Sequence, residues 1–363
     1  PRSTLFPYTT LFRSLLNEKG GVQDDMILMR VSLEEFIMVI NAGHDITGEG
    51  EDHGERVDLI ADVDRIMMHK LDNEDVQALD VSDQFVKIDI QGPLSYKLIK
   101  DIYGESVLKN RNNPEKNMNF FCFNEFTLDS ALYYLSRTGY TNRWGWELYI
   151  PVERASEDFK IIVSKALDLG GLLVGLGGRD ENRISAGAFG LPLMGQEYDP
   201  YHTPVNAPLF EAAIDMTKED FIGKKALQTQ LDCNIQKKMS IVVSEGIVTG
   251  RGVYRNGKRI GSVTSSINSP NISHEKRIAI GSKRRNVNEA DGTAAIGLCW
   301  LTNSPYEQSL EGIDVTEING QPVRIPVELY KEDGAKNPQG SPVLGYLTQE
   351  GISIATASKP LKS

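Results

Sequence analysis

The sequence predicts an α+β fold with a β-rich C-terminal domain. Strand and helix patterns alternate in the first two thirds of the chain, whereas short β runs dominate after about Gln230. The chain has 363 residues, of which 40% are hydrophobic and 25% charged, within the range of ordinary globular proteins. It is long enough for two or three domains, and we place the boundary before the β-rich domain near residues 231–236.

Two strands and a helix are predicted in the first third. Residues 35–41 form an apolar run that ends at a glycine-containing turn, which is typical of a buried strand. Residues 85–90 alternate apolar and charged side chains, the period of a half-buried strand. Pro93 then opens a helix with one apolar face, and Gly104 is placed to stop it. The acidic residues 47–55 predict a solvated loop.

The same patterns continue to the β-rich part. Residues 132–135 and 148–150 read as strands, and residues 155–169 predict an amphipathic helix that two glycines end. Asn256 and Gly257 separate two β runs, which is a strong signal for a two-residue hairpin turn. The C-terminal third is therefore expected to be mostly β.

Composition excludes several classes of function. Lys and Arg total 39 against 50 for Asp and Glu, a net charge of −11 that argues against nucleic acid as the main partner. No apolar run approaches the roughly 18 residues needed to cross a bilayer. The three cysteines lie far apart without metal-ligand spacing, so we expect no metal site and buried thiols in a reducing cytoplasm.

The N-terminus has an unusual sequence. Residues 5–14 resemble the conceptual translation of a common short-read sequencing adapter. We therefore expect residues 1–14 to be an artefact and exclude them from the fold prediction, as one would exclude residues left by cloning. On this interpretation the natural sequence begins near Leu15 and lacks its upstream part.

Four segments could carry chemistry. Residues 20–25 read Gly-Gly-Val-Gln-Asp-Asp, and residues 136–147 read Ser-Arg-Thr-Gly-Tyr-Thr-Asn-Arg-Trp-Gly-Trp-Glu. Residues 175–180 read Gly-Leu-Gly-Gly-Arg-Asp, and residues 221–224 read Phe-Ile-Gly-Lys. In order and spacing they resemble the folate-binding aminomethyltransferase (T-protein) family of the glycine cleavage system, whose motifs read approximately GGxxDD, SRTGYTGExGxE, GLGxRD and FIGxxAL. One motif alone is weak, but four in the right order are specific.

The resemblance implies a fold, a reaction and partners. The family folds as a three-domain cloverleaf of antiparallel sheets flanked by helices, with a C-terminal β-barrel or jelly-roll-like domain. We therefore expect a folate-binding body over residues 15–234, made of two interleaved domains, and a β-rich domain over residues 235–363. The implied cytoplasmic enzyme transfers a methylene unit from the aminomethyl-dihydrolipoyl group of the carrier H-protein to tetrahydrofolate and releases ammonia.

Asp25 is the candidate catalytic residue. From sequence alone, an aspartate after a glycine pair could bind a basic nitrogen of a ligand or cap backbone N–H groups, and Asp24 has an equal claim. The resemblance favours Asp25, which in the family sits beside the N5–N10 edge of tetrahydrofolate. It also places Asn41 at the border of the folate pocket.

Three further residues are candidates for folate binding. A single carboxylate can accept the adjacent N–H and NH₂ donors of a pterin, which matches the family role of Glu147. Tyr140 belongs to the wall on which the pterin stacks. Arg179 is expected at a helix N-terminus, where the resemblance assigns it the glutamate tail and makes Asp180 the helix cap. Considered alone, Glu147 would by default be a solvent-facing strand glutamate, and Arg179 would more often form a surface salt bridge.

Departures from the family pattern keep two other functions open. Residues 142–144 replace small and acidic residues of the family turn, and Met29 and Met194 stand where the family has pocket tyrosines. These changes would suit a tetrahydrofolate-dependent demethylase of small methylated substrates. A non-catalytic folate-binding protein would need Glu147 and Arg179 but not Asp25. The iron–sulfur-repair branch is disfavoured because residues 190–196 lack its cysteine.

Overall fold

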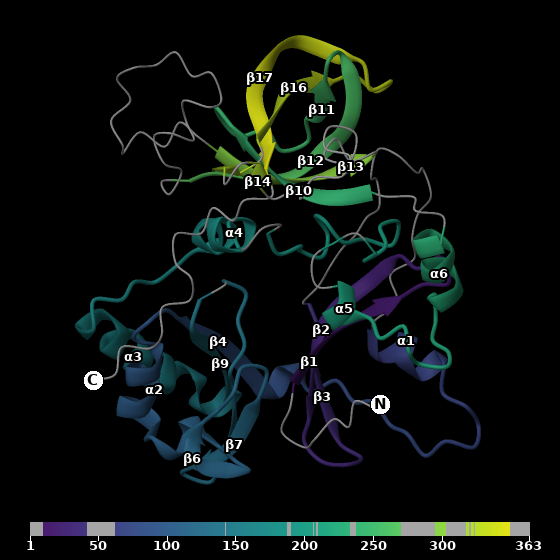
Figure 1. The fold of residues 1–363 in the computed structure, drawn as a ribbon. Coiled ribbons are helices and arrows are strands. Elements are labelled where there is room, and N and C mark those ends of the chain that lie inside the picture. Colours follow the sequence, from purple (N-terminus) through teal and green to yellow (C-terminus); the bar gives the residue numbers. More distant parts are fainter. Residues whose placement is uncertain are drawn as a thin grey trace. The chain divides into compact units, whose positions relative to one another are not determined.

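A computed structural model gives the fold of the chain (Figure 1). It describes residues 10–41, 62–141, 143–186, 190–205, 207, 210–232, 237–269, 295–302, 317–318, 321–322 and 324–348. Among these, unit 1 comprises residues 10–13 and 25–174, and unit 2 comprises residues 14–24 and 175–348. The two compact units are described separately below.

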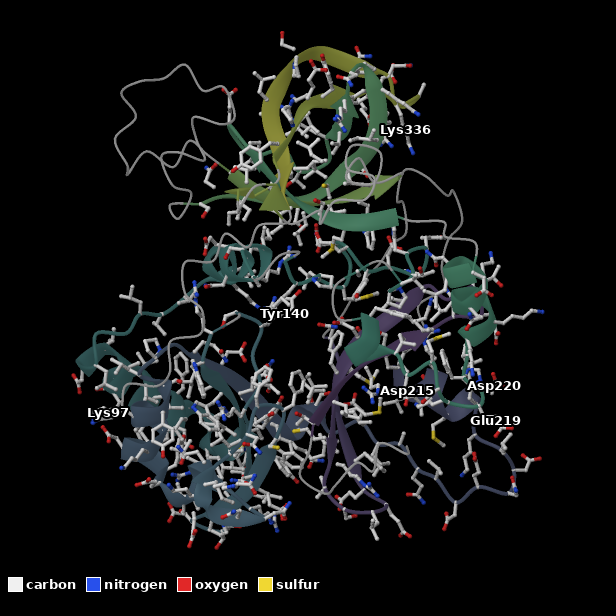
Figure 2. All side chains as sticks on the ribbon, viewed as in Figure 1. Lys97, Tyr140, Asp215, Glu219, Asp220 and Lys336 are labelled. Atoms are coloured by element: carbon white, nitrogen blue, oxygen red, sulfur yellow. The ribbon has the colours of Figure 1, made fainter. Side chains whose placement is uncertain are left out.

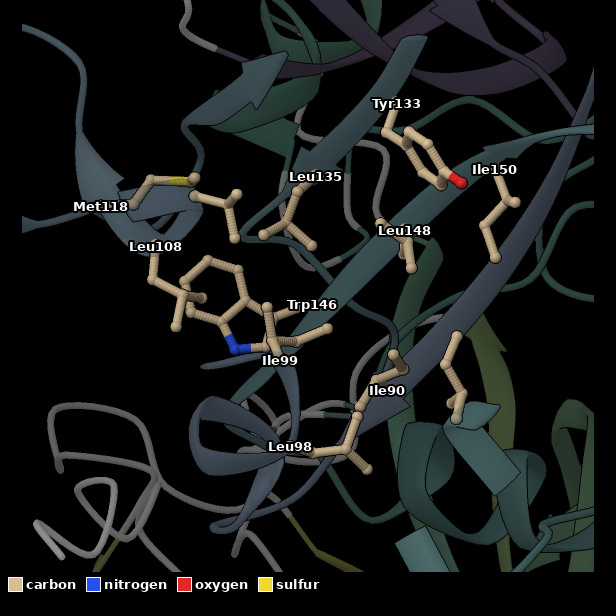
Figure 3. Packing of buried hydrophobic residues seen from close by; sticks show 12 residues of the cluster. Ile90, Leu98, Ile99, Leu108, Met118, Tyr133, Leu135, Trp146, Leu148 and Ile150 are labelled. Atoms are coloured by element: carbon tan, nitrogen blue, oxygen red, sulfur yellow. The ribbon is translucent and has the colours of Figure 1, made fainter. Parts of the chain in front are cut away.

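Unit 1 is built on a four-stranded antiparallel sheet with the order β4-β9-β8-β7. The strands are β4 (Phe85–Gln91), β7 (Phe123–Leu128), β8 (Ala131–Ser136) and β9 (Gly145–Pro151). Helices α2 (Ser95–Tyr103) and α3 (Val152–Asp168) cover one face of this sheet. Figure 3 shows the core between them, where Trp146, Leu148 and Ile150 of β9 pack with Leu98 and Ile99 of α2.

A second core lies on the opposite face of the same sheet. The N-terminal sheet has the order β1-β2-β3, with β1 (Thr10–Leu16), β2 (Val22–Arg30) and β3 (Phe36–Val39). Ile27 and Met29 of β2 pack in one cluster with Tyr134 of β8 and Tyr149 of β9. Side chains alternate along a strand, so β9 sends Leu148 to the helices and Tyr149 to this second core. The four-stranded sheet is thus the middle layer of unit 1.

Shorter elements complete unit 1. They are α1 (Asp62–Met68), the 3₁₀ turns η1 (Ser82–Gln84) and η2 (Ser106–Leu108), β5 (Lys109–Asn110) and β6 (Asn113–Asn117).

Unit 2 contains a closed barrel with the order β10-β13-β12-β11-β16-β17. Its strands are β10 (Lys237–Ser244), β11 (Gly252–Arg255), β12 (Lys258–Asn268), β13 (Ala295–Thr302), β16 (Arg324–Glu332) and β17 (Pro338–Thr348). Pairing of β10 with β17 closes it, and inward residues such as Val242, Val253 and Leu329 fill the interior. Outside the barrel lie α4 (Leu176–Ile184), α5 (Phe210–Ala213), α6 (Lys224–Asp232), β14 (Glu317–Ile318) and β15 (Gln321–Pro322).

The α+β class and the β-barrel at the C-terminal end are confirmed. Asn256 and Gly257 have φ angles of 51° and 72°, which fit the predicted two-residue turn between β11 and β12. Helix α2 begins at Ser95, two residues after the predicted Pro93, and ends at Gly104 with φ 89° as expected. The acidic residues 47–55 and most of the predicted boundary at 231–236 lie outside the described residues. The adapter origin of residues 1–14 stays a prediction.

Candidate functional site

Asp25 and Asn41 lie opposite each other on neighbouring strands. The antiparallel register pairs Ile27 with Val39, so the next pair on the same face of the ribbon is Asp25 with Asn41, just beyond β3. The Asn41 amide donates to the main-chain oxygen of Asp25 at 2.9 Å and to its Oδ1 at 2.8 Å. Asn41 therefore fixes the orientation of the Asp25 carboxylate.

The Asp25 side chain projects towards the layer between the two sheets of unit 1. Asp25, Ile27 and Met29 alternate along β2 and share one face, and the last two pack against Tyr134 and Tyr149. Asp24 points the other way and is buried. The strand alternation therefore distinguishes two adjacent aspartates that the sequence alone left equivalent.

Glu147 projects into the same layer from the middle sheet. In β9 it lies two residues before Tyr149 and directly opposite Asp89 of β4. The residue is only 5% exposed. Lys87 donates to Oε1 at 2.7 Å, and the Thr138 hydroxyl donates to Oε2. The buried carboxylate therefore has one charged and one neutral donor within its own unit.

These donors keep Glu147 ionised. Burial alone would raise the pKa of the Glu147 carboxyl, because a low-dielectric environment disfavours the charge. The charge of Lys87 and the hydrogen bonds from Lys87 and Thr138 outweigh burial and hold that pKa below its ordinary value. At neutral pH the site therefore presents a buried anion.

The side chain of Tyr149 lies on the same face of β9 as that of Glu147. The Tyr149 hydroxyl belongs to a residue that is 7% exposed, and among the described residues it has no hydrogen-bond partner. The charges of Glu147 and Asp89 act on this hydroxyl, and after burial they are the causes that raise the Tyr149 pKa. Buried hydroxyls are rarely left unpaired, so a ligand with a polar edge fits this position.

The turn that carries Tyr140 is shaped around Gln91, at the end of β4. The Gln91 amide donates to the main-chain oxygens of Thr138 and Trp146, both at 3.3 Å. A Cβ at Gly145 would lie 2.0 Å from Gln91 Oε1, so a larger residue at this motif position would displace the Gln91 side chain. Tyr140 is half-buried in this turn (Figure 2). The turn before β9 is thus closely packed around Gln91, and it positions Glu147 in the strand.

The altered part of this turn has an internal stacking contact. The Arg137 guanidinium lies 4.0 Å from the ring centroid of Trp144, a cation–π geometry. Asn142 lies outside the described residues. Met29 and Met194, which stand where the family has pocket tyrosines, are almost fully buried at 0% and 2% exposure.

Arg179 lies in unit 2, in the first half of α4. The helix begins after Gly175, and the Arg179 amide donates to the Gly175 carbonyl at 3.2 Å. The prediction that Asp180 caps the helix is wrong. Asp180 is the fifth helical residue, and its carboxylate accepts from Arg183 Nε at 2.6 Å. Gly175 provides the extended N-cap backbone without a side-chain bond. Asp180, five residues later, instead forms an i,i+3 pair with Arg183 inside the helix.

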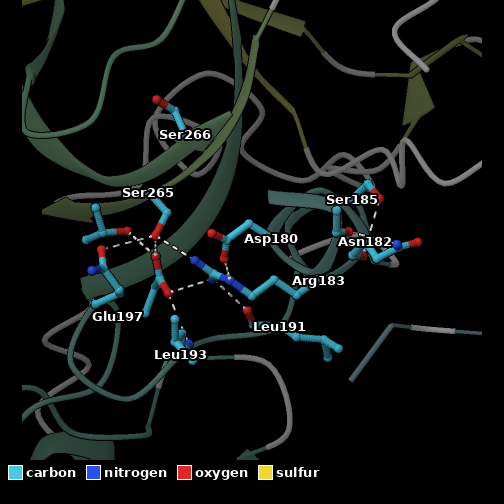
Figure 4. A network of polar contacts seen from close by, with 12 residues as sticks. Asp180, Asn182, Arg183, Ser185, Leu191, Leu193, Glu197, Ser265 and Ser266 are labelled. Atoms are coloured by element: carbon cyan, nitrogen blue, oxygen red, sulfur yellow. Dashed lines mark hydrogen bonds and ion pairs between the residues drawn. The ribbon is translucent and has the colours of Figure 1, made fainter. Parts of the chain in front are cut away.

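Arg183 and Glu197 form a buried ion pair in unit 2 (Figure 4). Arg183 Nη1 lies 3.0 Å from Glu197 Oε2, and the side chains are 2% and 0% exposed. Ser265 of β12 accepts from Arg183 Nη2 at 2.9 Å and donates to Glu197 Oε1 at 2.6 Å. This network fastens α4 to the barrel.

Sequence reasoning missed Lys87, Thr138 and Tyr149. The charge of Lys87 was visible in a strand that alternates apolar and charged residues, but its partner depends on the pairing of β4 with β9. Among the described residues, no cluster of His, Cys, Asp and Glu could hold a metal ion. In the same part of the chain, no helix has the length and apolar character required to span a membrane.

Comparisons with known proteins add three likenesses. A family model described as the GCVT N-terminal domain matches residues 7–218. An aminomethyltransferase from Desulfitobacterium hafniense (strain DSM 10664 / DCB-2) is 28% identical over 330 residues, covering 89% of this chain and 77% of the relative. One from Clostridium botulinum (strain Kyoto / Type A2) is 32% identical over 274 residues, covering 74% and 67%.

A solved structure has the same fold. It is the glycine cleavage system aminomethyltransferase T from Bartonella henselae, with a TM-score of 0.66 and 21% identity. The match covers 95% of this chain and 76% of that chain. The fold expected from the four motifs is therefore confirmed.

Proposed function

The chain belongs to the GCVT N-terminal domain family, and on that premise we propose that it is the tetrahydrofolate-dependent aminomethyltransferase of a glycine cleavage system. The proposed reaction moves a methylene unit from an aminomethyl-dihydrolipoyl carrier to tetrahydrofolate and releases ammonia. The observation that carries the proposal is the pair of carboxylates, Asp25 and Glu147, directed into one layer of unit 1 from two facing sheets.

Glu147 supports folate as the co-substrate. Its buried, ionised carboxylate suits the N–H and NH₂ donors of a pterin, and a carboxylate has about four lone-pair sites, so Thr138 leaves acceptor capacity on Oε2. The Tyr149 hydroxyl, which has no hydrogen-bond partner among the described residues, supplies another polar contact from the same face of β9. Bound tetrahydrofolate would supply the amine nitrogens that receive the carbon unit.

Asp25 is assigned the proton-handling role. Asn41 holds its Oδ1, which leaves the carboxylate oriented instead of free to rotate. A carboxylate fixed in this way can hold a ligand nitrogen in position and accept or return its proton. In this assignment Asn41 is a positioning residue that acts through Asp25.

Arg179 is assigned to the glutamate tail of the folate. Its half-buried guanidinium lies in the first half of α4, where backbone N–H groups of the first turn also favour an anion. The carrier is assigned as the lipoylated H-protein.

Reconstitution tests the proposal. Purified protein with aminomethylated lipoyl carrier and tetrahydrofolate should form methylenetetrahydrofolate and ammonia in equal amounts. Asp25→Asn should lower the rate by about 10²–10⁴-fold, the usual contribution of a positioned acid or base. Tetrahydrofolate affinity should change little. Glu34→Gln, an exposed carboxylate between β2 and β3, is the matched control and should keep full activity.

The alternatives give different results in the same assay. Turnover of a methylated amine without carrier would contradict the aminomethyl donor and favour the demethylase. Folate binding without turnover in either assay would favour the non-catalytic protein.

A further inference from the structure

Lys87 is a charged residue of unit 1 that the proposed function does not use. In β4 it lies two residues from Asp89, which pairs directly with Glu147 of β9, so all three share one face of the sheet. The ammonium is 2.7 Å from Glu147 Oε1 and 3.6 Å from Asp89 Oδ1. The cation is therefore placed between two carboxylates.

The exposure of these side chains determines how a ligand reaches Glu147. The Glu147 side chain is 7% exposed, whereas that of Lys87 is 36% exposed. Asp89 is similarly open at 35%. Thr138 and Ser136 are buried and linked by a 2.9 Å hydrogen bond on the Oε2 side. A ligand edge that contacts Glu147 therefore approaches from the Oε1 side, past the Lys87 ammonium.

The pair presents an acceptor and a donor side by side. Glu147 Oε1 accepts, and Lys87 Nζ donates 2.7 Å away. A ring N–H adjacent to a ring carbonyl offers the complementary donor and acceptor at similar spacing, and inserting such an edge would satisfy both charges. In the pterin ring of folate, N3–H adjoins the 4-oxo group and the 2-amino group.

We propose that Lys87 is a specificity-determining residue that donates to the 4-oxo group of the pterin while Glu147 accepts from N3–H and the 2-amino group. This inference rests on the proposed function. On ligand entry the direct bond between Lys87 and Glu147 is exchanged for bonds to the ligand edge. Thr138 holds Glu147 in place during the exchange, because its bond is to the other oxygen. A 4-amino group places a donor against the ammonium and is rejected.

Two ligands that differ along the edge from N3 to position 4 test the proposal. Folic acid carries the 4-oxo group and N3–H, and aminopterin carries a 4-amino group and an unprotonated N3 on the same skeleton. Calorimetric titration of the wild-type protein should show folic acid binding at least about tenfold more tightly, as expected for a hydrogen bond from a charged donor. Lys87→Met should weaken folic acid binding by about the same factor and narrow the preference, leaving only the part due to the N3–H that folic acid offers to Glu147.

The controls separate the inference from the proposed function. Lys97→Met removes an exposed α2 lysine that pairs with Asp101 at 2.9 Å, and it should leave both affinities unchanged (Figure 2). Equal wild-type affinities for the two ligands would overturn the inference without any variant, as would an unchanged preference in Lys87→Met. Absence of binding of both ligands and of tetrahydrofolate to the wild type would instead overturn the proposed function.

Discussion

Glu147 in unit 1 and Glu197 in unit 2 are both buried carboxylates bonded to a cation, but their partners differ. Glu197 accepts from Arg183, the Leu193 amide, Thr264 and Ser265, all within 3.0 Å. Glu147 accepts from Thr138 and from a Lys87 that is one-third exposed. A carboxylate with four internal donors stabilises the fold, whereas one with an exchangeable solvent-side donor is suited to bind a ligand.

Replacing the cation that is bonded to each buried glutamate should give the largest difference in stability between the two sites. Arg183→Met leaves Glu197 buried without its charged partner, and we expect a loss of about 3–5 kcal/mol in the free energy of unfolding. Lys87→Met should lose only about 1 kcal/mol, because its partly exposed position lets water take its place. Urea denaturation followed by circular dichroism measures both. Equal losses would contradict the distinction between a structural and a binding carboxylate.

Acid titration should reveal the ionised state of Glu147. Its folded pKa lies below the ordinary value of 4.5, so its contribution to stability is complete above pH 4.5 and is lost as pH falls through the folded pKa. The stability difference between wild type and Glu147→Gln should therefore shrink as the pH is lowered from about 5 to 3. Thermal unfolding across this range measures the difference, and a gap that widens towards low pH would contradict the assignment.

Two tyrosines give the smallest and most closely matched comparison. Tyr254 of β11 donates to Glu332 at 2.7 Å. Burial and this hydrogen bond raise the Tyr254 pKa to about 12. Tyr254→Phe should therefore cost about 1 kcal/mol of unfolding free energy. Tyr149→Phe removes a hydroxyl without a partner among the described residues and should cost nothing measurable. Urea denaturation of the two variants side by side measures these free energies of unfolding. A larger loss for Tyr149→Phe than for Tyr254→Phe would contradict the assignment of the Tyr149 hydroxyl to a ligand.

Local sequence patterns were sufficient to predict those strands, helices and turns whose formation depends on a single stretch of the chain. Residues 85–90 form a strand, α3 contains the amphipathic run, and Asn256-Gly257 forms the hairpin turn. The α+β class followed from their order along the chain. The start of α2 differs by two residues from the prediction, which is within the usual spread of helix ends.

The candidate site was only partly predictable. Asp25, Asn41 and Glu147 were identified from motifs, but their orientation required the register between strands. Lys87 comes from a strand 60 residues before Glu147, and no local pattern indicates such a pairing. Asp180 was assigned a cap from its place in a motif, whereas in the structure it forms an i,i+3 ion pair with Arg183 of the same helix.

Direct titration of tetrahydrofolate under anaerobic conditions tests the central claim, that Glu147 is the pterin-binding carboxylate of an aminomethyltransferase. Calorimetry should show one molecule bound by the wild type and by the Glu34→Gln control. Glu147→Gln should bind about 10–100-fold more weakly, the loss expected when an ionised acceptor is replaced by a neutral amide. No binding by the wild type, or equal binding by Glu147→Gln, would contradict the claim.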